Sequence, residues 1–121
     1  MDYTTQMDAA RKGIVTPQMK IVAEKEHMPV EKLMALVASG KVAIPANKVH
    51  TSLSPEAVGQ DCRTKINVNL GVSPEHNNHE EELQKVQNAI DMKAEAIMDL
   101  SNFGKTRDFR RKLVKMSTAM I

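Results

Sequence analysis

The sequence predicts an α/β fold in which an N-terminal helical segment precedes two strand–helix units. Residues 65–71 alternate apolar with polar side chains, as β-strands do, and residues 94–100 form a second extended apolar run. Apolar residues at helical spacing follow each run, over 79–92 and 106–116. The order strand, helix, strand, helix is typical of right-handed βαβ units in a parallel sheet.

Two short helices are predicted at the start of the chain. Thr16 is a suitable N-cap and Pro17 suits the first helical position, so the first helix is expected to run to about Glu26. A second helix is expected from Pro29, with Gly40 placed where a left-handed C-cap residue belongs. The apolar stripes of these helices are Met19, Val22 and Ala23 in the first, and Val30, Leu33, Met34 and Val37 in the second.

A connector is predicted between these helices and the first strand. Residues 42–45 form a brief extended run that ends at a proline, and residues 46–61 are rich in turn and capping residues. One helical turn is expected within the connector, over 55–58. The chain is therefore expected to have two parts, a helical segment with its connector over residues 1–61 and two βα units over residues 62–121.

The strand predicted over 65–71 has two chemically different faces. One face is apolar and the other polar, namely Ile66, Val68 and Leu70 against Lys65, Asn67 and Asn69. Asparagine is a poor strand former, because its amide competes with the backbone for hydrogen bonds. The polar face is therefore either bathed in water or next to a group that needs amides, and the residues alone favour water.

Capping residues and apolar stripes locate the two later helices. Asn78 is well placed to cap the first, with Glu81 three residues later in a capping-box arrangement. The expected buried faces are Leu83, Val86 and Ile90 in the first helix, and Phe109, Leu113 and Met116 in the second. Residues 117–121 are apolar enough to begin a third strand, which a parallel sheet needs for stability.

The bulk composition predicts a soluble, intracellular, cytoplasmic protein. Its 17 Lys and Arg against 15 Asp and Glu give a net charge of +2, which favours neither nucleic acid nor a membrane surface as partner. No apolar run approaches the roughly 20 residues that span a bilayer, and the N-terminus has no signal-peptide core. The single cysteine, Cys62, fits a reducing compartment. Nine Met, two Phe, one Tyr and no Trp predict a core of flexible side chains.

Two clusters have the spacing of ligand sites but more ordinary interpretations. His76 and His79 lie beside glutamates, yet the sequence nominates no further metal ligand, and a surface loop is the favoured interpretation. The basic residues within 107–115 lack interleaved aromatic residues and are typical of the solvated side of a helix. Residues 104–108, GKTRD, lack the upstream glycine of a phosphate-binding loop.

Five ordered segments together resemble the N-terminal part of a known family. They are TQM at 5–7, ARKGI at 10–14, IPAN at 44–47 with His50, KINVNLG at 65–71, and IMDLS at 97–101. Their combination resembles the phosphomethylpyrimidine synthases, the radical S-adenosylmethionine enzymes of thiamine pyrimidine biosynthesis. The resemblance covers nearly the whole chain. It departs from the family at Lys48 and Val49, which replace the small or polar pair usual before His50.

The resemblance implies that the chain ends with the first two βα units of an incomplete (β/α)8 TIM-type barrel. The implied reaction converts 5-aminoimidazole ribotide to 4-amino-2-methyl-5-(phosphomethyl)pyrimidine, using a [4Fe-4S] cluster that cleaves S-adenosylmethionine to a radical. The family also carries zinc, and the full-length enzyme is expected to be a homodimer. The family's substrate contacts fall here on Asn69 and Met98, each at the C-terminal end of a predicted strand, where barrel active sites are built.

The same resemblance implies an N-terminal fragment that is inactive alone. The family's substrate-binding tyrosine, zinc-binding histidines and cluster-binding cysteines are absent, and one cysteine cannot hold a cluster. No catalytic or metal-binding residue is therefore assigned. Two alternatives stay open, a hydroxybenzimidazole synthase that acts on the same ribotide, and a truncated, non-catalytic interaction module. An open sheet edge and an aromatic-poor core argue against the second alternative.

Overall fold

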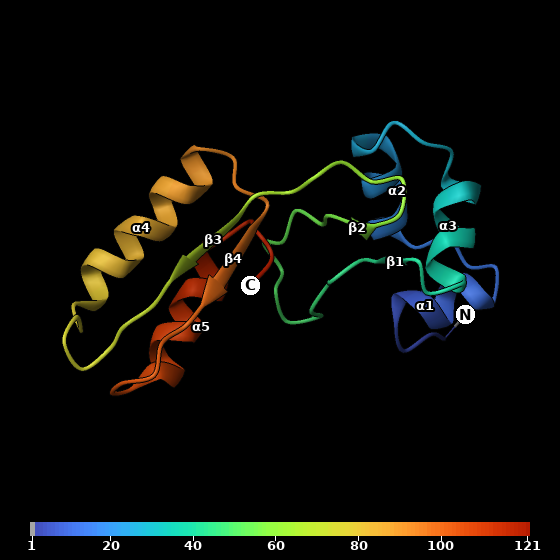
Figure 1. Cartoon of the computed structure of the whole chain (residues 1–121). Coiled ribbons are helices and arrows are strands. Elements are labelled where there is room, and N and C mark those ends of the chain that lie inside the picture. The colour runs from blue at the N-terminus through green and yellow to red at the C-terminus, as the bar shows by residue number, and fades with distance from the viewer. Residues whose placement is uncertain (1) are drawn as a thin grey trace. The chain divides into compact units, whose positions relative to one another are not determined.

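The computed structural model, which describes residues 2–121, divides into two units with separate hydrophobic cores (Figure 1). The first unit contains the residues up to Asn47 together with Pro55–Thr64. The second contains Lys48–Ser54 together with Lys65–Ile121. None of the helices described has the length and apolar character that a membrane crossing requires.

Three helices form most of the first unit. They are α1 (Gln6–Arg11), α2 (Pro17–Lys25) and α3 (Val30–Ala38). The predicted start of α2 is confirmed, because the Thr16 hydroxyl accepts a hydrogen bond of 3.1 Å from the Met19 N–H. Gly40 follows α3 with a φ of 77°, which confirms the predicted left-handed residue.

Helix α1 is absent from the sequence-based expectations, although the chain carries a signal for it. The Thr5 hydroxyl accepts a hydrogen bond of 3.0 Å from the Asp8 N–H, which caps the first turn. Ala9 and Ala10 are buried in the core of the first unit. The signal for α1 is therefore a polar N-cap followed by two small buried residues. The helix has six residues, which are too few to show a periodic apolar stripe.

Residues 55–58 do not form the helical turn that the sequence predicts. Strand β2 (Val58–Gly59) instead pairs antiparallel with β1 (Val42–Ala43), so the extended run expected near residue 42 is confirmed. The backbones approach so closely that a Cβ added to Gly59 would lie 2.2 Å from the Lys41 carbonyl oxygen. Strand pairing thus holds this segment extended.

Ion pairs to a buried carboxylate also hold the segment before β2 in place. Ala57 is fully buried, and the adjacent Glu56 carboxylate lies 2.7 Å from the Lys25 ammonium and 3.3 Å from the Arg63 guanidinium. The Arg63 backbone N–H donates a hydrogen bond of 2.7 Å to Oε2 of Glu26, which is a second buried carboxylate. Because these partners are distant in sequence, local pattern gave no sign of them.

The second unit contains two parallel strands, each followed by a helix (Figure 1). The elements are β3 (Asn67–Leu70), α4 (His79–Asp91), β4 (Ala96–Asp99) and α5 (Thr106–Met116). The predicted strand–helix–strand–helix order is confirmed, with each strand shorter than expected. The predicted cap is confirmed too, because the Asn78 side chain accepts a hydrogen bond of 3.1 Å from the Glu80 N–H.

A single parallel bridge forms at the end of the chain, within the segment where the sequence predicts that a third strand could begin. Met120 forms a parallel bridge with Ala96, and the Ile97 N–H donates a hydrogen bond of 2.7 Å to the Met120 carbonyl oxygen. The segment before it is fixed by His50, whose Nε2 donates to the Ser117 carbonyl oxygen over 2.6 Å. β4 therefore has neighbours on both edges, whereas β3 has β4 on one edge.

The core of the second unit lies between the sheet and its helices. Phe109 and Leu113 of α5 are buried, as predicted, whereas Met116 is about one-third exposed. Val86 of α4 and Ile97 of β4 complete the centre of this core. Both helices thus contribute to one apolar layer, and the opposite face of the strands, which carries Asn69 and Met98, lies outside this core.

Candidate functional site

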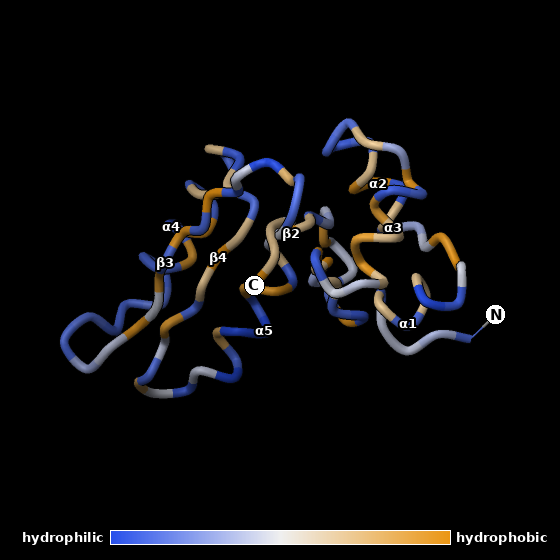
Figure 2. The backbone as a smooth tube through the Cα atoms, turned by 45° about the vertical axis from the view of Figure 1, so that its right-hand side comes forward, coloured by the Kyte–Doolittle hydropathy of each residue, from blue (hydrophilic) through white to orange (hydrophobic). Residues whose placement is uncertain are grey.

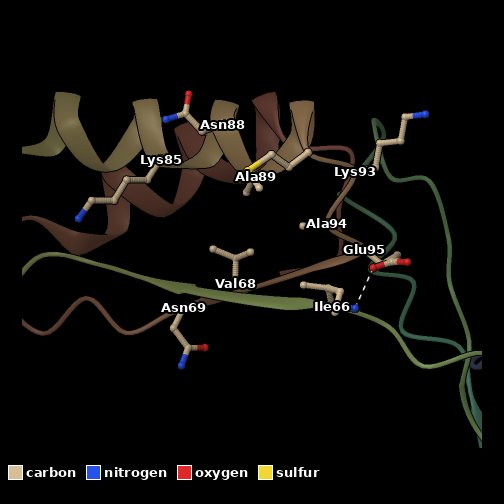
Figure 3. A pocket seen from close by; sticks show the side chains of 10 residues that line it. Ile66, Val68, Asn69, Lys85, Asn88, Ala89, Lys93, Ala94 and Glu95 are labelled. Carbon is tan, nitrogen blue, oxygen red and sulfur yellow. Dashed lines mark hydrogen bonds between the residues drawn. The ribbon is translucent and has the colours of Figure 1, made fainter.

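The two faces of β3 and β4 differ as the alternation in the sequence predicts. Val68 and Leu70 of β3 and Ile97 of β4 belong to the core on the helix side. Asn69 and Met98 lie on the other face, where Asn69 is exposed and Met98 is 50% exposed. Figure 3 shows the Val68 side chain pointing toward α4 and the Asn69 side chain pointing to the opposite side of the strand. The candidate site is this second face.

Asn69 and Met98 are direct partners in the parallel register of β3 and β4. Residues paired in this way present their side chains side by side on one face of the sheet. Each is followed by one more strand residue, so both lie near the carboxyl end of their strand. The structure therefore brings together the two residues that the sequence singles out.

Asn67 supports the amide of Asn69. Its Nδ2 donates a hydrogen bond of 2.8 Å to Oδ1 of Asn69, along the same strand face. The bond fixes the plane of the Asn69 amide, whose Nδ2 donates to no residue in the described part of the chain. An amide N–H donor beside the thioether of Met98 can bind a molecule that has both a hydrogen-bond acceptor and an apolar or aromatic ring.

The backbone after β3 is held by a buried carboxylate that the sequence analysis missed. Glu82 of α4 is 3% exposed, and its Oε2 accepts a hydrogen bond of 2.8 Å from the Gly71 N–H. Of the expected buried face of α4, Val86 is buried as predicted, whereas Leu83 and Ile90 are partly buried. The other two buried residues of the helix are Glu82 and Ala89. The spacing of Glu82 from Val86 was the available signal, since the two lie four residues apart on one helix face.

The backbone after β4 is held by a second missed group. Arg110 Nε donates to Asp99 Oδ2 over 2.6 Å, and the Asp99 side chain is 5% exposed. Burial acts to raise the pKa of Asp99, but hydrogen bonds from Ser101 and the guanidinium of Arg110 outweigh this effect and hold the pKa below its ordinary value. Asp99 is therefore a charged, ordered group beside the candidate site.

The two histidines and the basic helix do not join this site. His76 lies in the loop before α4, which is mainly hydrophilic in Figure 2, and its side chain is exposed. The His79 ring packs against the Phe109 ring in a tilted arrangement, with a centroid distance of 5.3 Å and an interplanar angle of 43°. Arg107 and Arg111 of α5 are exposed, as expected for the solvated side of a helix. Within residues 2–121, no three His, Cys, Asp or Glu side chains are placed to hold a metal ion.

An apolar groove of about 470 Å³ lies on the other side of β3. Ile66, Val68 and Ala89 line it (Figure 3), and so does Met92, which is 83% exposed. Asn69 borders the groove, but its side chain points to the opposite face. The groove therefore belongs to the helix layer rather than to the candidate site.

Comparison with known proteins identifies the family. Residues 5–121 match the model of a family described as "Radical SAM ThiC family". The chain is 68% identical over 121 residues to the phosphomethylpyrimidine synthase of Clostridium novyi (strain NT), and equally to that of Clostridium botulinum (strain Hall). Each alignment covers 100% of this chain and 28% of the relative. From the match over nearly its whole length, the chain belongs to the radical SAM ThiC family.

Proposed function

We propose that the chain supplies part of the ribotide site of a phosphomethylpyrimidine synthase. The full-length enzyme is then the polypeptide that contains this chain and has the length of its relatives. The reaction would convert 5-aminoimidazole ribotide to 4-amino-2-methyl-5-(phosphomethyl)pyrimidine in thiamine biosynthesis. The observation that carries the proposal is the pairing of Asn69 with Met98 in a chain 68% identical to enzymes of that name.

Each of the two residues has a role that suits its chemistry. The Asn69 amide would hydrogen-bond a polar group of the ribotide, since an amide offers both donors and an acceptor. Met98 would contact the imidazole ring, because a thioether packs favourably against an aromatic ring. Asn67 would hold the Asn69 amide in its orientation through their 2.8 Å hydrogen bond.

The proposed architecture is a (β/α)8 barrel, of which residues 62–121 would be the first two βα units and residues 1–61 an N-terminal helical segment. Three features support it: β3 and β4 are parallel, helices cover one face of them, and Met120 forms a parallel bridge with Ala96 of β4. Active sites of such barrels lie at the carboxyl ends of the strands. Asn69 and Met98 occupy that position.

The donor set of this chain does not fit a [4Fe-4S] cluster. Such clusters need several thiolates, and Cys62 is the single cysteine in the sequence. The radical SAM family implies S-adenosylmethionine and an iron–sulfur cluster for the enzyme, so we place their ligands, and those of zinc, outside these 121 residues. The homodimer expected of the full-length enzyme is likewise a proposal.

The two alternative functions are less well supported. A hydroxybenzimidazole synthase would act on the same ribotide, but the relatives reported above carry the name phosphomethylpyrimidine synthase. A non-catalytic interaction module would have to leave the outer edge of β3 and its apolar groove exposed to water.

The proposal is tested by product formation. Full-length enzyme with a reconstituted cluster is incubated anaerobically with S-adenosylmethionine, a reductant and the ribotide, and the phosphorylated pyrimidine is measured by mass spectrometry. We expect turnover by the wild type and a large loss in Asn69→Ala, with normal turnover in the control Asn88→Ala, whose amide bonds Gln84 on α4. Formation of hydroxybenzimidazole instead would select the paralogue.

A further inference from the structure

The carboxyl ends of β3 and β4 are tied together by a network that is anchored on α5. Arg110 is its outermost member, and it makes two separate bonds. Its Nε donates to Asp99 Oδ2 over 2.6 Å, and its Nη2 donates to the Ser101 carbonyl oxygen over 2.9 Å. The planar guanidinium can make both bonds at once because its donors form a rigid fork.

Asp99 links Arg110 to the backbone after β4. Its Oδ1 accepts a hydrogen bond of 2.9 Å from the Ser101 N–H, while Oδ2 is bound by Arg110. The carboxylate is almost completely buried, with 5% of its side chain exposed. Residues 99–101 are thus held at three points, and Met98 directly precedes them.

Ser101 links this backbone to the segment that follows β3. Its buried hydroxyl accepts a hydrogen bond of 3.0 Å from the Val72 N–H, and the Val72 carbonyl oxygen accepts one of 3.0 Å from the Asn102 N–H. The backbones are close enough that a Cβ added to Gly71 would lie 2.5 Å from the Ser101 nitrogen. The position of Asn69, two residues before Gly71, therefore depends on where Ser101 is held.

We propose that Arg110 is a positioning residue for the ribotide site. It lies on the helix behind the sheet, and through Asp99 and Ser101 it sets the spacing between Asn69 and Met98. This inference rests on the proposed function, because it assigns Arg110 to the same site. Small displacements of binding groups are costly, since a shift of about 1 Å can reduce activity by about 100-fold.

A neighbouring ion pair on the same helix provides the contrast. Arg111 Nη1 lies 3.7 Å from Asp108 Oδ1, and their side chains are 66% and 67% exposed. Exposed pairs of this kind contribute little, because water screens the charges and both side chains lose freedom. Arg110 and Arg111 therefore share residue type, helix and sequence neighbourhood, and both are exposed. They differ in their partners, because the Asp99 side chain is 5% exposed and that of Asp108 is 67% exposed.

The test measures ribotide affinity in the full-length enzyme without its cluster, by calorimetric titration. We expect Arg110→Gln to weaken binding by about 10- to 100-fold, with a melting temperature close to that of the wild type. Arg110→Lys should recover part of the affinity, since its ammonium can pair with Asp99 but cannot also hold the Ser101 carbonyl. Asp99→Asn should weaken binding in the same direction, and Arg111→Gln should leave it unchanged.

Three results would overturn the inference. One is wild-type affinity in Arg110→Gln while Asn69→Ala binds weakly, which would leave the proposed function intact. Another is an equal loss of ribotide affinity in Arg110→Gln and Arg111→Gln. The third is a loss of ribotide binding in Arg110→Gln that is fully explained by the fraction of unfolded protein in its melting curve, with no recovery of affinity in Arg110→Lys. If the wild type does not bind the ribotide at all, the proposed function fails, and the inference fails with it.

Discussion

The Glu82 carboxylate of α4 accepts a hydrogen bond of 2.8 Å from the Gly71 N–H at the end of β3. This contact predicts that Glu82→Ala loosens the strand end, because a buried N–H that loses its partner costs about 1–3 kcal/mol. Hydrogen exchange at the Gly71 amide of the full-length enzyme measures the effect directly. Its protection should fall in Glu82→Ala by about 5- to 150-fold, which is the same free energy expressed as an equilibrium constant.

Two variants serve as controls for this prediction. Glu82→Gln keeps an oxygen acceptor and should retain most of the protection at Gly71. Glu81→Ala changes an exposed residue in the same helical turn and should act through the helix dipole alone, at about 0.3–1 kcal/mol. Equal protection in Glu82→Ala and the wild type would show that the carboxylate does not hold the loop.

Gly71→Ala should destabilise the enzyme by about 2–6 kcal/mol, by combining backbone strain with steric overlap. Gly71 has a φ of 142°, and its added Cβ would lie 2.5 Å from the Ser101 nitrogen. Gly104 is the matched control, since it also has a positive φ, 74°, but nothing lies within 4 Å of its added Cβ. Melting temperatures of the two variants should differ clearly, and equal values would contradict the close approach of the two loops.

Asp99 predicts a specific pH dependence of stability. Its pKa is lower in the folded than in the unfolded state, so its contribution is present above the unfolded pKa and is lost as pH falls through the folded pKa. In Asp99→Asn this part of the acid sensitivity should disappear. Melting temperatures measured from about pH 7 to about pH 3 should therefore fall less steeply in the variant than in the wild type. Parallel curves would mean that the carboxylate is not stabilised by Ser101 and Arg110.

The isolated 121-residue chain should be aggregation-prone or molten. Among residues 2–121, β4 is the only strand that pairs with β3, and the groove beside β3 exposes Ile66 and Met92, which are 62% and 83% exposed. Unpaired strand edges next to apolar surface promote association. Thermal unfolding and amide NMR at low concentration measure this property. A sharp cooperative transition with well-dispersed signals would instead support an independent module.

Local patterns predicted the parts of the fold whose cause is local. The alternation around Val68 predicted β3, and the amide of Asn78 predicted the start of α4, because each signal lies within one element. The role of Glu82 was missed, since its partner Gly71 lies on another element and a carboxylate in a first helical turn ordinarily faces water. The helical turn expected over 55–58 was wrong for the same reason.

The candidate site likewise combines features that the local sequence predicts with features that depend on tertiary packing. Alternation placed Asn69 on a polar face but could not distinguish water from a ligand, and the family resemblance added Met98. Together they predict that the two residues lie near each other on neighbouring strands, but the exact register that pairs them is a tertiary fact that neither source contains. Arg110 looked like one member of a solvated basic stripe, because its bonds to Asp99 and Ser101 depend on how β4 packs against α5.

The central claim is that Asn69 and Met98 face one bound ribotide. Methyl NMR of full-length enzyme labelled at the methionine methyl groups tests it most directly, with Met98 assigned through Met98→Leu. Met92, which lines the groove on the helix side, is the internal control. We predict that the Met98 signal shifts and saturates with added ribotide while the Met92 signal does not, and that Asn69→Ala moves the saturation to higher concentration. Saturable ribotide binding that leaves the Met98 signal unchanged would contradict it.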